Sequence, residues 1–159
     1  MVSGKWTLRL FCKENCLWKT YNSISKCVVW NVEFVKTFNE LEVYKLSREL
    51  SLSLFEMSKS FPKEEKFSLT DQVRRSSRSI GAQIAEAWAK RMYEKHFVSK
   101  LTDSVGEQLE TQHWIEIAED CKYLSKENAC ELLTKCCSIG RMLNAMINKS
   151  HNFCKNSNL

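Results

Sequence analysis

From Asn39 onward, apolar residues recur at steps of three or four positions, the spacing that places side chains on one face of a helix. The first stripe runs from Val43 to Phe61 and ends where Pro62 is followed by charged residues. Two further stripes lie in residues 69–88 and 129–147. Between them the third consists of Phe97, Leu101, Val105, Leu109 and Ile115. Four amphipathic helices with short connections predict an all-α, antiparallel up-down four-helix bundle over residues 38–150.

Local signals place two of the helix starts. Ser68 precedes the second stripe with Asp71 three residues later, a pair that resembles a capping box, and Ser125 precedes the fourth stripe. Between Ala87 and Phe97 no glycine, proline or strong cap residue marks a boundary. One helix spanning the second and third stripes would be roughly 75 Å long at 1.5 Å per residue. We therefore expect a break there.

The two ends of the chain differ from the bundle. Residues 1–37 are rich in aromatic and β-branched residues with partial alternation, a weak strand-like signal. Three interpretations stay open for this extension: a hairpin packed on the bundle, a disordered arm, or sequence upstream of the true start. The tail, residues 151–159, is polar and rich in asparagine, and we expect it to be disordered.

Charge is distributed unevenly along the 159 residues. The net charge of +5 comes from the ends, since residues 38–150 contain as many basic as acidic side chains. Within the bundle the net charge is +3 over residues 68–93, −5 over 94–120 and +3 over 121–150. One explanation is that the acidic helix pairs with its basic neighbours. The other is a strip for phosphate groups, repeated around an oligomer, made of Arg74, Arg75, Arg78, Lys90 and Arg91.

The second helix also has a face of small residues opposite its core seam, formed by Gly81, Ala82, Ala85 and Ala89. Small residues let another backbone approach closely, and a glycine inside a helix costs about 1 kcal/mol relative to alanine. This face predicts an oligomer interface. The alternative is that alanine occurs there only as a good helix former.

No complete catalytic or metal site is recognisable in the sequence. Glu110 and His113 have the spacing used by di-iron bundles, but a second such pair is missing. The eight cysteines match no zinc pattern, and Cys136 lies on an apolar seam, as expected of a small buried side chain. We predict no enzyme activity, metal or cofactor. Without a signal-like or membrane-spanning segment, a reducing cytoplasm is expected.

Several strings resemble the 23S rRNA intervening-sequence proteins, a bacterial family of four-helix bundles that includes the accessory variability determinant of diversity-generating retroelements. LEVYKLSRELSLSLFEMSKSFPKEEKFSLTDQVRRSSRSIGAQIAEAW resembles the first two helices of the family, and GEQLETQHWIEIAEDCKYLS resembles the third. Arg74 and Arg75 match its paired arginines, and the central motif matches at Ser79, Ile80, Ile84, Ala85 and Glu86. The chain departs from the family at Ala87, where glycine is usual, and near Met92, where a polar helix start is usual.

The resemblance implies a non-enzymatic homopentamer. In the retroelement branch it also implies binding to RNA or DNA and to a reverse transcriptase. Our leading hypothesis is therefore a homo-oligomeric bundle that binds nucleic acid. The alternative is an oligomeric bundle that binds other proteins and has no nucleic-acid role.

Overall fold

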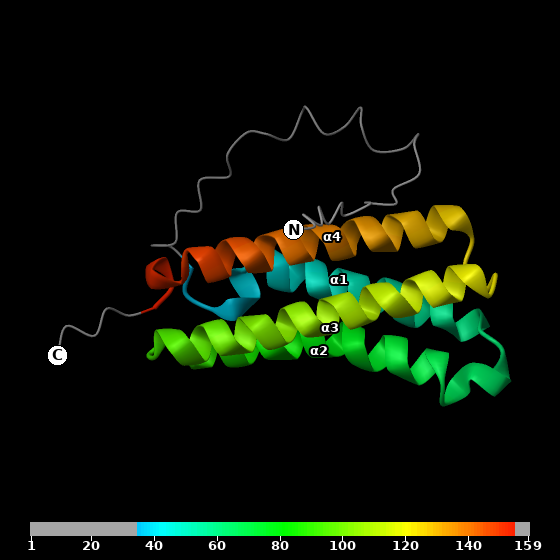
Figure 1. The fold of residues 1–159 in the computed structure, drawn as a ribbon, viewed down its shortest axis with the longest axis horizontal. Helices are drawn as coiled ribbons and strands as arrows, with labels where there is room; N and C mark the ends of the chain where they lie inside the picture. Colours follow the sequence, from blue (N-terminus) through cyan, green and yellow to red (C-terminus); the bar gives the residue numbers. More distant parts are fainter. Residues whose placement is uncertain (1–34, 155–159) are drawn as a thin grey trace, which may run out of the picture. The chain divides into compact units, whose positions relative to one another are not determined.

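The computed structural model describes residues 35–154, in which four long helices lie side by side (Figure 1). Their bounds are Glu42–Met57 (α1), Leu69–Ala89 (α2), Glu94–Asp120 (α3) and Lys126–Asn148 (α4). Consecutive helices pack against each other, and α4 returns to α1. The predicted all-α four-helix bundle is confirmed. Of the N-terminal extension only residues 35–37 are described. Of the tail, for which disorder is predicted, residues 151–154 are described and ordered: Ser150–Asn152 forms a 3-10 helix, and the ring of Phe153 stacks on Phe97 with centroids 5.9 Å apart.

Short 3-10 helices occupy the ends and one connection of the bundle. Their bounds are Phe38–Glu40, Ser58–Ser60, Lys63–Lys66 and Ser150–Asn152. The core between the long helices consists of large apolar side chains that are at most 1% exposed, among them Leu50, Ile80, Phe97, Leu101 and Ile139. No helix in this part of the chain is long and apolar enough to cross a membrane.

The helix boundaries agree with the sequence at two of three places. The backbone N–H of Asn128 donates to Ser125 Oγ at 3.2 Å, which confirms the predicted cap of α4. The expected break is present, because α2 ends at Ala89 and α3 begins at Glu94. The predicted Ser68 cap is wrong. The hydroxyl of Ser68 donates to the Glu65 carboxylate instead and accepts no N–H from α2.

The predicted seam of α3 is wrong at Leu109, which is 57% exposed. Each step of four residues along a helix advances by about 400°, which is about 40° more than a full turn. After the three steps from Phe97, Leu109 therefore points roughly 120° away from it. Gln108 points only about 20° away from the direction of Phe97, and it is buried in place of Leu109.

Polar side chains consequently fill the middle of the inward face of α3. Ser104 donates to the carbonyl of Ile80 at 3.1 Å, and the Thr111 and Ser76 hydroxyls of α3 and α2 lie 3.0 Å apart. Against α4, a Cβ at Gly140 would lie only 2.8 Å from Gln108 Oε1. The packing of α3 is therefore close against both α2 and α4, and its contact with α2 includes hydrogen bonds.

Candidate nucleic-acid interface

The helices α1 and α2 approach closely at Gly81. A Cβ placed there would lie 3.2 Å from Ser47 Oγ and 3.5 Å from the ring of Tyr44. Glycine thus lets α1 approach closely, which gives this residue an explanation within one chain. Ala82 and Ala85 are not covered in this way.

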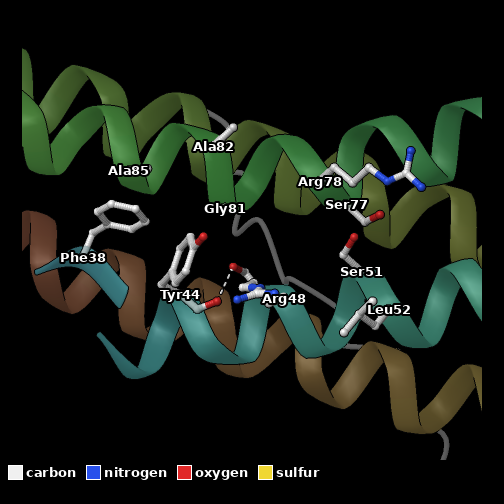
Figure 2. A pocket seen from close by; sticks show the side chains of 11 residues that line it. Phe38, Tyr44, Arg48, Ser51, Leu52, Ser77, Arg78, Gly81, Ala82 and Ala85 are labelled. Carbon is white, nitrogen blue, oxygen red and sulfur yellow. Dashed lines mark hydrogen bonds between the residues drawn. The ribbon is translucent and has the colours of Figure 1, made fainter. Parts of the chain in front are cut away.

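Beside this contact the two helices enclose a groove of about 370 Å³ that is open to solvent (Figure 2). From α1 it is lined by Tyr44, Ser47, Arg48, Ser51 and Leu52. From α2 it is lined by Ser77, Arg78, Gly81, Ala82 and Ala85. Phe38 lies at one end of this α1–α2 groove and Leu52 at the other. The walls are mostly small, and the two charged residues are both arginines.

A basic cluster continues from the groove around the ring of Phe55 in α1. The guanidinium carbons of Arg74 and Arg78 lie 5.0 and 5.8 Å from the ring centroid, and Lys59 Nζ lies 4.8 Å from it. Arg74 Nε also donates to the hydroxyl of Ser58 at 2.7 Å. A cation is attracted to the face of an aromatic ring, so these contacts favour side-chain positions of the two arginines and Lys59 close to Phe55.

The arginines of this face have no acidic partner within the described part of the chain. No carboxylate of residues 35–154 lies within 4 Å of the guanidinium groups of Arg48, Arg74 or Arg78, whereas Lys59 is paired with Glu56 at 2.7 Å. Planar guanidinium groups bind phosphate oxygens through two parallel hydrogen bonds. We call Arg48, Arg74 and Arg78 the α1–α2 basic face.

Ion pairs elsewhere connect neighbouring helices. Lys100 on α3 lies 3.1 Å from Glu86 on α2 and 3.2 Å from Asp103, and the hydrogen bonds to these carboxylates raise its pKa. Lys135 on α4 lies 2.9 Å from Glu49 on α1. Its partial burial lowers the lysine pKa, but hydrogen bonds to Glu49 and Glu131 outweigh this effect and the net shift is upward.

The five predicted phosphate-binding residues do not form one strip. Arg74 and Arg78 lie together, but Arg75 donates to Gln72 at 2.8 Å and its charge acts on Glu107 of α3. Lys90 and Arg91 follow the C-terminal end of α2, which is about 16 Å along the axis from Arg78.

Arg91 also stacks on Trp88 at 3.9 Å. Sequence reasoning missed Arg48, because α1 carries no excess of basic residues that would single it out.

The remaining sequence candidates show no metal chemistry. Glu110 accepts a hydrogen bond from the indole of Trp114 at 3.1 Å, while His113 is exposed. Within residues 35–154 no group of three or more His, Cys, Asp or Glu side chains is placed to hold a metal ion. Cys136 is buried, as predicted, and burial raises the pKa of its thiol to about 12.

The geometry defines a class: an all-α four-helix bundle with one basic, grooved face. The chain belongs to the 23S rRNA-intervening sequence protein family, whose model matches residues 39–145. It is also similar to the crystal structure of a protein of unknown function from the S23 ribosomal protein family of Bacteroides thetaiotaomicron. The two are 28% identical with a TM-score of 0.61 over 67% of this chain and 95% of that one. No curated protein matches the chain.

Proposed function

We propose that this protein acts by binding and not by catalysis, as a homo-oligomeric bundle that binds nucleic acid through the α1–α2 basic face. The observation that carries the proposal is the pair Arg48 and Arg78, which line one groove from opposite helices without a carboxylate partner among the described residues. Cations of this kind replace the counterions of a phosphate backbone, and the released counterions drive binding.

Assembly would strengthen this binding. A single face has few cations, but its repetition around an oligomer would multiply the phosphate contacts and the local field. The resemblance to the family implies five copies, and in the retroelement branch an accessory role to a reverse transcriptase. We retain both as part of the proposal. The predicted oligomer interface at Gly81, Ala82, Ala85 and Ala89 overlaps the groove, because the first three of these residues line it, so a second copy and nucleic acid would compete for this surface.

The test is binding of a fluorescently labelled structured RNA, measured by anisotropy at low salt. We expect the wild type to bind and Arg48→Ala/Arg78→Ala to lose most of its affinity. Lys90→Ala/Arg91→Ala is the matched control, because it removes two positive charges at the other end of α2. Arg74 is left intact because it hydrogen-bonds the buried Ser58. Equal affinity of the two double variants contradicts the proposed face.

A second function is favoured by one observation: Leu52, at one end of the groove, is 61% exposed. An exposed apolar residue beside small walls is suited to a helix of another protein. In this alternative the oligomeric bundle binds proteins and no nucleic acid. Absence of RNA binding at low salt, together with a stable oligomer in light scattering, would favour it.

A further inference from the structure

The α1–α2 groove combines cations with an aromatic wall. The rings of Phe38 and Tyr44 meet edge to face, with centroids 4.9 Å apart and an interplanar angle of 89°. Arg48 follows Tyr44 by one helical turn, about 6 Å along α1. In Figure 2 the two rings lie at one end of the groove and Arg78 lies toward the other. One ligand could therefore contact an aromatic ring and a guanidinium group at the same time.

Hydroxyl groups line the groove between these two ends. Ser47 donates its hydrogen to the carbonyl of Tyr44 at 2.7 Å, and Ser77 donates to the carbonyl of Arg74 at 3.2 Å. Because each hydroxyl hydrogen is used, the oxygens remain as acceptors. Ser51 faces Ser77 across the groove (Figure 2). Ser47 and Ser77 are each only 1% exposed, whereas Ser51 is half-buried, so of these three hydroxyls that of Ser51 is the one that can bond the edge of a base.

We propose that the groove holds an unpaired nucleotide, with the base against Tyr44 and the phosphate at Arg48 and Arg78. This inference rests on the proposed nucleic-acid function and specifies its substrate as single-stranded. The volume of about 370 Å³ lies within the range of about 300–1,000 Å³ that is typical of small-molecule sites. The groove could hold either a nucleotide or an apolar helix of another protein. The two arginines favour the nucleotide, because it is an anion.

A duplex would use only part of this site. Its bases are stacked on each other and paired at their edges, so its phosphates could reach the arginines while Tyr44 and Ser51 stayed unused. An unpaired base has a free face for the aromatic ring and a free edge for the hydroxyl of Ser51, the features by which proteins recognise single strands. The groove is therefore expected to bind single-stranded nucleic acid more tightly than a duplex.

The experiment compares three probes at one salt concentration: a short single-stranded RNA, the same strand annealed to its complement, and the same strand with abasic sugars. Stacking of one base changes affinity by roughly tenfold. We expect the wild type to bind the single strand about that much more tightly than the duplex or the abasic strand. Ala85→Phe, which fills the groove, should abolish this preference.

The matched control is Ala89→Phe, one turn further along α2 and outside the groove, which should keep the preference. Tyr44→Leu gives a second variant that removes the ring without filling the groove, and it should also lose the preference. Thermal melts establish that each variant is folded.

Three outcomes overturn the inference. Equal binding of single strand and duplex overturns it and leaves the proposed function standing, whereas no binding of any probe defeats both. A change in oligomer mass with Ala85→Phe and not with Ala89→Phe, measured by sedimentation, would show that the groove is an interface between copies.

Discussion

The contacts made by α3 differ in kind from the contact between α1 and α2. Around α3 the packing is close, with hydroxyls hydrogen-bonded across helices and Gln108 fitted against Gly140. Between α1 and α2 the helices touch at Gly81 and then leave a groove that solvent enters. The first kind of contact determines how the helices align, and the second leaves a concave surface for a ligand.

The charged residues also differ between the surroundings of α3 and the face formed by α1 and α2. Lys100 of α3 pairs with Glu86 of α2 and with Asp103 of its own helix, and the charge of Arg75 on α2 acts on Glu107, so two carboxylates of the acidic helix are balanced by cations of the bundle. Arg74 and Arg78 lie on the side of α2 that faces α1, and Arg48 lines the same groove from α1. A region with no net charge can therefore present a positive face, because its opposite charges are segregated by helix.

The largest effect on stability is expected when a larger side chain is placed at the close contact between α3 and α4. Gly140→Leu should destabilise the protein by about 1–3 kcal/mol, because a leucine overpacks the buried contact with Gln108 by more than the roughly 1 kcal/mol that α4 gains when its glycine is replaced. Ala82→Leu, in the open groove, should change the free energy of unfolding by no more than about 0.5 kcal/mol. Urea denaturation measures both. Similar losses in the two variants would mean that the groove is packed as tightly as the contacts of α3.

A smaller effect should come from the buried hydroxyl pair. Thr111→Val leaves Ser76 without its partner across the helices and should cost about 1–2 kcal/mol. The double variant Ser76→Ala/Thr111→Val should lose less than the sum of the two single variants, since neither partner is then left unpaired. A double-mutant cycle in urea tests this. Strict additivity would show that the two hydroxyls do not interact.

The sequence predicts the bundle because each helix has an apolar stripe with a helical period. It fails at Leu109, where steps of four drift out of phase and a glutamine takes the buried place. It also fails at Ser68, whose hydroxyl has a competing acceptor in Glu65. Each of these errors concerns one side chain. The fold is still predictable, because it depends on the whole apolar stripe of each helix and not on one residue.

The site was only partly predictable. Arg74 and Arg78 share a helix and a spacing of four, so the sequence brings them together. Arg48 reaches the same groove from α1, thirty positions before Arg78, and helical periodicity cannot relate residues on different helices. The sequence groups Lys90 and Arg91 with them, whereas the structure places both just after the C-terminal end of α2, where Arg91 contacts Trp88.

The smallest expected effect concerns Glu107. Burial raises the pKa of this carboxyl, and Glu110 adds to the rise while Arg75 opposes it. Because the folded pKa lies above the unfolded one, ionisation destabilises the fold, and stability falls as the pH rises through these two values. Glu107→Gln should therefore raise Tm slightly at neutral pH and leave it unchanged at about pH 3, below the usual carboxyl range. Thermal melts at the two pH values check this, and a lower Tm at neutral pH would show that the attraction to Arg75 dominates.

The central claim, that the α1–α2 basic face binds phosphates, is tested most directly by the salt dependence of affinity for single-stranded RNA. The logarithm of the binding constant should fall linearly with the logarithm of the salt concentration. The slope should be shallower by roughly one to two in Arg48→Ala/Arg78→Ala, since each lost phosphate contact removes about 0.7. Lys90→Ala/Arg91→Ala should keep the wild-type slope. Identical slopes for the wild type and the Arg48/Arg78 variant would contradict the account.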